Sequence, residues 1–222
     1  MKQFTNILFN LGYFLVLTMT AIALLFLSGQ ILISHTYIPL HIAEGVKFVT
    51  NPWYFYPLLI LFLFALFGLR PLLEKIKIPY LLVGLSLLYI AAAFFLITSY
   101  SGIIRADAKH VFNAALAFNQ GDYSSLTTVG SYMYRNPHQL GLMTLERLYA
   151  YISPTTRFAF GMNVIWSLLS NFLIYKIAAL LNRKEIIQKY TILLTFLFLP
   201  QLFFVLFIYG TIPGLFFCLL SL

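Results

Sequence analysis

The chain has 222 residues, of which 61% are hydrophobic and 9% are charged, and its formal net charge is +8. Soluble domains carry roughly a quarter charged residues, so this composition excludes an ordinary water-soluble domain and indicates an integral membrane protein. The positive charge does not indicate a nucleic-acid partner, because the basic residues are scattered and mostly flank apolar segments.

Three apolar segments come first along the chain. The first covers about residues 7–33, and no charged residue lies between Lys2 and Glu44. A bilayer core needs roughly 20 apolar helical residues, so this segment is long enough to span a membrane. It exceeds the core of a signal peptide, which favours a retained anchor. The second and third predicted spans cover about residues 53–69 and 79–99.

Three further apolar segments follow a long polar stretch. The fourth and fifth predicted spans cover about residues 158–181 and 190–209, and the sixth begins near Thr211 and stops at Leu222. Twelve helical residues rise only about 18 Å, which is less than the ~30 Å of a hydrocarbon core. We therefore expect a truncated sixth helix and a chain that is the N-terminal part of a longer protein.

The predicted fold class is thus all-α: a polytopic transmembrane protein with about five full spans and a truncated sixth. One membrane domain is expected over residues 1–222. Basic residues set its predicted orientation, because short connections rich in Lys and Arg stay in the cytoplasm. Two such connections contain Arg70, Lys75, Lys77, Arg183, Lys184 and Lys189. The N-terminus is then cytoplasmic, the segment 100–157 lies outside, and a bacterial plasma membrane is the expected location.

Two amphipathic helices are predicted in this outer loop, lying on the membrane surface. The first has an apolar stripe of Ala108, Val111, Phe112, Ala115 and Phe118. Asp107 stands at its expected N-cap and Gly121 at its end. The second is expected to begin with Asn136 as N-cap and Pro137 at the first helical position. Its apolar stripe consists of Leu142, Leu145, Leu148, Tyr149 and Ile152.

Both aspartates of the chain, Asp107 and Asp122, lie in the outer loop. Asp107 follows the third span closely, between Arg105 and Lys109, and a carboxylate held between two cations can act as a base or bind a metal. Helix capping by Asp107 and a turn at Asp122 are the simpler interpretations, and capping is compatible with catalysis.

No metal site is predicted. His35 and His41 lie six residues apart with Glu44 beyond them, but they form no closed ligand set. No cofactor is required by the pattern, and a divalent metal is left open. Gln30, Asn163, Asn171 and Gln201 lie within spans and are expected to form hydrogen bonds between helices.

The outer loop resembles the first outer loop of GT-C superfamily glycosyltransferases, in the group of protein O-mannosyltransferases and lipid A aminoarabinose transferases. The resemblance is carried by Asp107 after a membrane helix, by Gly121-Asp122-Tyr123 and by the segment 132–141, YMYRNPHQLG. A further segment, Tyr209-Gly210-Thr211, has Thr where the family often has Asp. The resemblance covers roughly residues 85–215, and the loop follows the third span here, whereas it usually follows the first.

This resemblance implies transfer of a sugar from a polyprenyl-phosphate carrier to an unidentified acceptor on the outer face, with membrane lipid as a further partner. Asp107 is the expected base that takes the proton of the acceptor hydroxyl. Arg105, Lys109 or Arg135 can neutralise the lipid phosphate. The full expected substrate-binding set is Arg105, Lys109, Asp122, Tyr132, Arg135, His138 and Gln139.

Two other functions stay open. A transporter or flippase for lipid-linked sugars should carry ionisable residues within its spans, and here Lys176 alone does so, near an edge. A non-catalytic or degenerate membrane protein is the second alternative. Because helices for a lipid-carrier groove are lacking, the isolated chain is expected to show no transferase activity.

Overall fold

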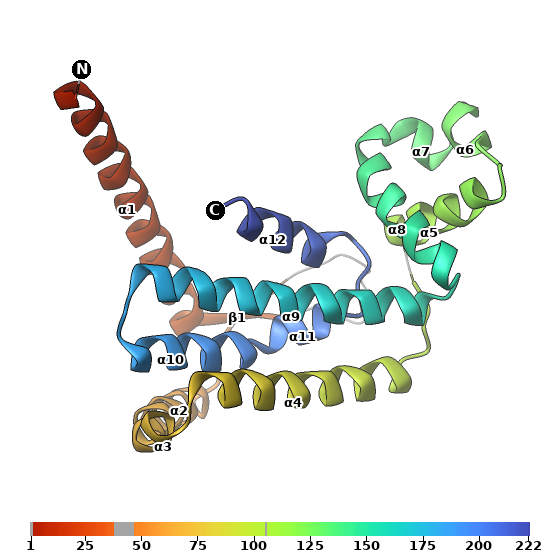
Figure 1. Ribbon diagram of the computed structural model, residues 1–222. Coiled ribbons are helices and arrows are strands. Elements are labelled where there is room, and N and C mark those ends of the chain that lie inside the picture. Colours follow the sequence, from red (N-terminus) through yellow and green to blue (C-terminus); the bar gives the residue numbers. More distant parts are fainter. Residues whose placement is uncertain (1, 38–46, 105) are drawn as a thin grey trace. The chain divides into compact units, whose positions relative to one another are not determined.

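The computed structural model describes residues 2–37, 47–104 and 106–222. Its contacts divide the chain into two compact units, Met1–Gly68 and Leu69–Leu222, which are treated separately (Figure 1). Helices dominate both units. Among the described residues, four helical segments are long and apolar enough to cross a membrane: Asn6–Ile33, Phe55–Lys75, Ile78–Ser99 and Thr156–Leu181, of which the second is made of two consecutive helices. They correspond to the first four predicted spans: the second ends at Lys75 instead of residue 69, and the other ends agree within two residues.

The first unit contains α1 (Lys2–Ile33) and α2 (Phe55–Gly68). Between them lie two short strands, β1 (Ser34–Tyr37) and β2 (Lys47–Thr50), which pair antiparallel. The strand pair was not predicted from the sequence. The last carbonyls of a helix have no partner within the helix. Here Asn51 Nδ2 donates to Ile31 O at 2.6 Å and Tyr56 Oη donates to Leu32 O at 3.1 Å, so the segment after β2 closes the end of α1.

The second unit is built around α9 (Thr156–Leu181). Its other long helix is α4 (Ile78–Ser99), and both pack against α10 (Glu185–Phe196). The shorter apolar helices are α3 (Arg70–Lys75), α11 (Leu199–Phe204) and α12 (Thr211–Leu220). The outer loop folds into α5 (Ala106–Asn119), α6 (Ser124–Thr127), α7 (Tyr132–Arg135), the 3-10 turn η1 (Pro137–Gln139) and α8 (Leu140–Ile152). These loop helices gather where α4 ends and α9 begins (Figure 1).

The fifth predicted span, residues 190–209, is not a single helix. The structure divides it into α10 and α11, with a break at Leu197 and Phe198. Pro200 lies in the first turn of α11. Proline has no N–H to donate and its ring clashes with the preceding turn, so an unbroken helix cannot pass through it. The chain turns again after α11 and reaches α12 through Gly210, whose φ is +76°.

The first predicted helix of the outer loop is confirmed, but the buried face of the second is corrected. All five residues of the predicted α5 stripe are buried. On α8 only Tyr149 of the predicted stripe is buried, whereas Leu148 is 58% and Ile152 is 73% exposed. The face that packs consists of Met143, Glu146, Tyr149 and Ala150. The face of α8 that packs on α5 therefore includes a carboxylic acid. Hydrophobicity alone would not place a glutamate on the buried face of a helix.

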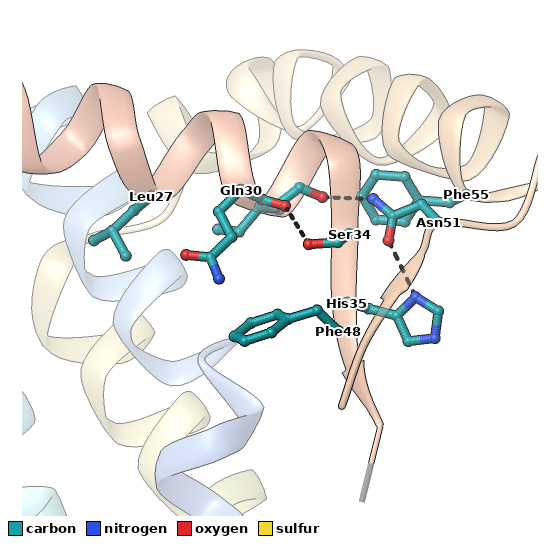
Figure 2. Close-up of a pocket in the computed structure, with 8 residues that line it drawn as sticks. Leu27, Gln30, Ser34, His35, Phe48, Asn51 and Phe55 are labelled. Atoms are coloured by element: carbon teal, nitrogen blue, oxygen red, sulfur yellow. Dashed lines mark hydrogen bonds between the residues drawn. The ribbon is translucent and has the colours of Figure 1, made fainter. Parts of the chain in front are cut away.

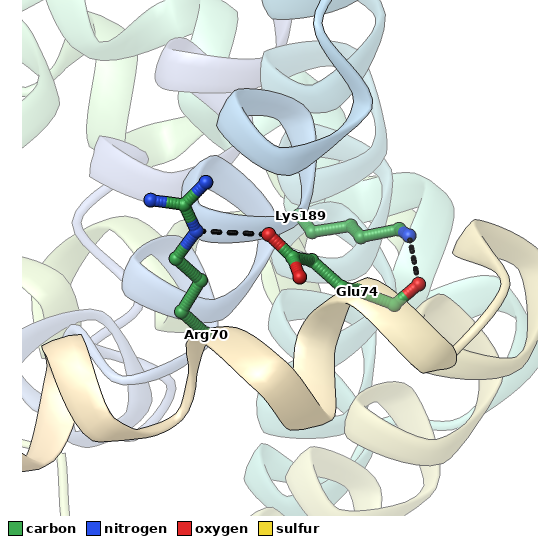
Figure 3. A network of polar contacts seen from close by, with 3 residues as sticks. All are labelled: Arg70, Glu74 and Lys189. Atoms are coloured by element: carbon green, nitrogen blue, oxygen red, sulfur yellow. Dashed lines mark hydrogen bonds and ion pairs between the residues drawn. The ribbon is translucent and has the colours of Figure 1, made fainter.

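The two short basic connections meet at one end of the second unit (Figure 3). Lys189 Nζ donates to the carbonyl oxygen of Glu74 at 3.3 Å and lies 3.3 Å from Glu185 Oε2. Arg70 Nε pairs with the Glu74 carboxylate at 2.8 Å. This end lies away from the outer loop, because α4 and α9 each connect one end to the other (Figure 1). The side of the membrane on which it lies stays a prediction.

Candidate functional site

The start of α5 sets the position of Asp107. The helix begins at Ala106, so Asp107 is its second residue and not its N-cap, which corrects the prediction. A carboxylate in the first turn is still favourable, since it faces the positive end of the helix dipole. Ala106 has a φ of +48°, in the left-handed region that costs a non-glycine residue roughly 1–2 kcal/mol. Such strain tends to occur at functional sites, which draws attention to this turn.

Three side chains come together beside this turn. The phenol of Tyr132, the first residue of α7, lies close enough to the Asp107 carboxylate to interact with it electrostatically. The rings of Tyr132 and His110 stack, with centroids 5.0 Å apart and an interplanar angle of 14°. His110 follows Asp107 by three residues, so both lie on the same side of α5. A carboxylate, a phenol and an imidazole therefore form one connected group.

The environment of Tyr132 raises the pKa of its phenol above the usual value. Partial desolvation is the largest cause, followed by the negative charge of Asp107 and its hydrogen bond, and then by Tyr209. The neutral phenol is the form that can donate to a carboxylate. Tyr209 lies in the connection between α11 and α12, and its charge acts on Tyr132 although it is 77 positions further along the chain (209 − 132 = 77).

An open hollow of about 580 Å³ adjoins the group. It is lined by His110, Gly130, Ser131, Tyr132, Arg135 and Asn136. Arg135 Nε donates to the carbonyl oxygen of Gly130 at 2.8 Å, and Arg135 Nη2 donates to the same oxygen. Asn136 Nδ2 donates to Tyr132 O at 2.9 Å. These bonds hold the guanidinium at the wall of the hollow, so the site combines a fixed cation with a carboxylate.

Asp122 does not join this group. It follows α5 at the far end of the helix, and the rise of 1.5 Å per residue puts about 18 Å between Asp107 and Asn119. Asp122 Oδ1 accepts a hydrogen bond from the backbone N–H of Ser124 at 2.9 Å, which confirms its interpretation as a turn residue. Hydrogen bonds with Ser124 lower the pKa of this carboxyl group below its usual value.

The remaining predicted binding residues are spread more widely. Lys109 is exposed on α5, and on η1 His138 is exposed and Gln139 is half-buried, with 3.5 Å between His138 Nε2 and Gln139 Nε2. None of these three lines the hollow described above. Arg105 lies outside the described residues. Within the described part of the chain, no three His, Cys, Asp or Glu side chains come together as a metal site requires.

Sequence reasoning missed two members of the site, His110 and Tyr209. The spacing of three residues between Asp107 and His110 is a signal that could have found the histidine. Tyr209 belongs to the segment 209–211, which was named for its resemblance to the family, but no local pattern connects it with Tyr132. Tyr209 approaches Tyr132 because the chain turns after α11. The predicted continuous span over residues 190–209 included neither the break between α10 and α11 nor this turn.

A second hollow, of about 390 Å³, lies in the first unit (Figure 2). Its walls include Leu27, Gln30, Ser34 and Phe48. His35 Nδ1 lies 3.3 Å from Asn51 Oδ1. Because Asn51 Nδ2 donates to Ile31 O, its Oδ1 faces the histidine, and the proton of a neutral His35 ring is assigned to Nδ1. The other two residues of the weighed metal pattern, His41 and Glu44, lie outside the described residues.

Comparison of the chain with models of protein families, with curated proteins and with solved structures finds no match.

Proposed function

We propose that this protein is a membrane glycosyltransferase of the GT-C type, which transfers a sugar from a polyprenyl-phosphate carrier to an acceptor on the outer face of the membrane. One observation carries the proposal: Asp107, Tyr132 and His110 form a connected group beside a hollow whose wall holds Arg135. The group lies at the end of apolar helices, where a lipid-linked substrate presents its phosphate.

The proposed reaction needs a base, and Asp107 supplies it. The carboxylate takes the proton of the acceptor hydroxyl while the acceptor oxygen attacks the anomeric carbon. The bond from that carbon to the phosphate oxygen breaks, and the polyprenyl phosphate leaves with its electron pair. The neutral Tyr132 phenol lies beside the carboxylate and can donate to it, and His110 supports the phenol ring by stacking on it.

The leaving phosphate needs a cation, and Arg135 supplies it. A guanidinium has five N–H donors, and Arg135 uses two of them on the Gly130 carbonyl. Three donors remain for phosphate oxygens, and hydrogen bonds between charged partners are roughly twice as strong as neutral ones. Anchoring by Gly130 means that little side-chain entropy is lost when the phosphate binds. The prenyl chain lies against the apolar helices.

The test compares two substitutions of Asp107 in membranes from cells that express the gene at its own locus. Transfer of labelled sugar from the polyprenyl-phosphate pool is measured. Asp107→Asn keeps the shape of the side chain and removes the base, so transfer should fall by ~10²–10⁴. Asp107→Ala should fall equally, and both proteins should be present at parental amounts.

Asp122→Asn is the matched control, because an Asn side chain also forms the turn that Asp122 makes with Ser124. It should keep parental transfer. If the Asp107→Asn variant keeps parental transfer as well, Asp107 is not the base. If the parent membranes themselves transfer no sugar, the non-catalytic alternative replaces the enzyme.

A further inference from the structure

The most unusual side chain of the outer loop is Glu146 on α8. It is 1% exposed, and both carboxyl oxygens are buried with no hydrogen-bond partner in the described part of the chain. Native proteins pair nearly all buried polar atoms, so two unpaired oxygens on one carboxyl group require an explanation. The proposed sugar transfer makes no use of this residue.

The surroundings of Glu146 are apolar on both sides along α8. Met143, one turn before it, belongs to a cluster with Val111 and Phe118 of α5. Tyr149, nearly one turn after it, belongs to a second cluster with Phe112 of α5 and Phe160 of α9. The carboxyl group therefore lies where α8 packs on α5, between two apolar clusters.

No described cation neutralises this carboxyl group. The titratable or charged groups on the elements packed against α8 are Asp107, Lys109 and His110 on α5, His138 on η1, Arg157, Tyr175 and Lys176 on α9, and Cys218 on α12. None of them donates a hydrogen bond to Glu146. On α8 itself, Arg147 is held elsewhere, since its Nε donates to Asn119 Oδ1 at 3.1 Å and its guanidinium lies over the Phe118 ring. Tyr149 interacts with the Glu146 charge, and its phenol accepts a bond from Trp166 Nε1.

An ionised carboxylate without a hydrogen-bond or ion-pair partner is not stable between these two apolar clusters. Removing an isolated charge from water costs far more than removing a neutral acid, so a buried group without a partner takes up a proton. Burial raises the pKa of Glu146 to about 8. The folded loop thus holds this side chain as a neutral carboxylic acid under ordinary conditions.

We propose that Glu146 is a proton-binding site of the outer loop: its carboxyl group carries a proton while α8 packs on α5, and loss of that proton loosens α8. This inference goes beyond the proposed sugar transfer and does not depend on it. It makes the packing of the loop sensitive to pH on the face of the membrane where the loop lies.

The direction of the effect follows from the two pKa values. A solvated glutamate has a value near 4.5, and Glu146 in the packed state has a value of about 8. Between these values the packed state binds one proton more than the loosened state, so packing weakens as the pH rises. Each pH unit favours the loosened state tenfold. The stabilisation of α8 packing by the protonated Glu146 is fully present below pH 4.5. It decreases between pH 4.5 and pH 8 and is lost above pH 8.

The first test titrates the carboxyl group directly in the full chain. Dicyclohexylcarbodiimide is an apolar reagent that adds to protonated carboxyl groups, and the modified peptide is quantified by mass spectrometry. Glu146 should be labelled at pH 7, with a loss of labelling centred near pH 8. Glu185, whose side chain is 72% exposed, is the internal control, and the apolar reagent should label its solvated carboxyl group far less than Glu146 at pH 7. Equal pH profiles for the two glutamates would overturn the proposal.

The second test measures thermal unfolding of the purified chain in detergent between pH 5 and pH 9. The parent should lose stability steadily from pH 5 to pH 8, whereas Glu146→Gln and Glu146→Leu should lack this slope. Two variants are used because the buried amide of Gln can itself destabilise α8, while Leu leaves no polar atom. A slope that persists in both variants would assign the pH dependence to another group and refute the role of Glu146.

Discussion

Asn163 is the buried polar residue that joins α9 to the end of the broken helix. It is 3% exposed, and its Nδ2 donates to the carbonyl oxygens of Val205 and Phe207, each at 3.1 Å. Those carbonyls need a partner because the chain stops being helical after Phe204. Gln201 similarly reaches Ser167 O at 3.5 Å, so two of the residues expected to bond between helices do so. Asn171, although buried, has no hydrogen-bond partner among the described residues.

Asn163→Leu should destabilise the protein because it leaves two buried carbonyls without a donor. Unpaired buried groups cost about 1–3 kcal/mol, although membrane surroundings tend toward the lower end. Ser170→Ala is the control, since Ser170 is equally buried but bonds only to Trp166 O of its own helix. Thermal unfolding in detergent should show a clear loss for Asn163→Leu and almost none for Ser170→Ala. Equal losses would mean that the bonds to Val205 and Phe207 contribute nothing.

Single residues were predictable from the sequence where their role is local. Asp122 forms its turn with a residue two positions away, and the α5 stripe follows from helical spacing alone. Tyr132 was chosen by resemblance, but its connections to His110 and Asp107 depend on how α7 folds back on α5. Glu146 was visible only as one of the loop's acidic residues, because no pattern rule places a carboxylic acid on the buried face of a helix.

At the scale of elements, the close approach of α8 to the start of α12 depends on Gly210. This residue is the N-cap of α12 and has a φ of +76°. A Cβ atom there would lie 3.1 Å from Leu142 Cδ1, which is tighter than normal contact. Leu142 and Gly210 border the same hollow between the two helices, of about 410 Å³. The break that divided the predicted fifth span is therefore also the turn that brings α12 against α8.

Gly210→Ala should destabilise the protein by about 1–2 kcal/mol, because a left-handed conformation is costly for any residue with a Cβ atom. Contact with Leu142 adds to that cost. Gly214→Ala is the control: Gly214 borders the same hollow, lies inside α12 and has open space where its Cβ would be. It should be neutral or stabilising, since alanine favours helix by up to about 1 kcal/mol over glycine. If Gly210→Ala and Gly214→Ala shift the unfolding midpoint equally, Gly210 has no special role in this contact.

Long elements were predicted well and interruptions poorly. The four long helical segments follow from their apolar composition, and all their ends but one lie within two residues of the expected ones; the second segment continues through α3 to Lys75. The strand pair β1–β2 and the short helices α6 and α7 have no periodic signal of sufficient length to identify them. Pro200 was visible in the sequence, but residues 190–209 were predicted as one span from their overall hydropathy. This averaging concealed the break between α10 and α11.

At the scale of the whole molecule, the second unit places its basic connections at one end and its polar loop at the other. This separation is what the positive-inside rule requires of a chain whose loop 100–157 lies outside. The orientation itself stays a prediction, because the arrangement of the helices does not show which end faces the cytoplasm. The expectation of a single membrane domain likewise stays a prediction.

Thiol labelling of intact cells tests the orientation. In a Cys218→Ser background, a cysteine at Val129, which is 81% exposed in the outer loop, should react with a membrane-impermeant reagent. Cysteines at Lys77 and Arg183, which are exposed at the opposite end, should react only after the cells are opened. All three should react in detergent, which confirms that each thiol is accessible. The opposite labelling pattern would reverse the orientation and move the proposed site to the cytoplasm.

The contact between Lys189 and the carbonyl of Glu74 joins residues 115 positions apart. A ribosome adds roughly 5–20 residues per second, so the partner of Glu74 emerges on the order of ten seconds later. During that interval the C-terminal end of α3 lacks its contact with α10, so this end of the second unit stays incomplete until the outer loop and α9 have been made.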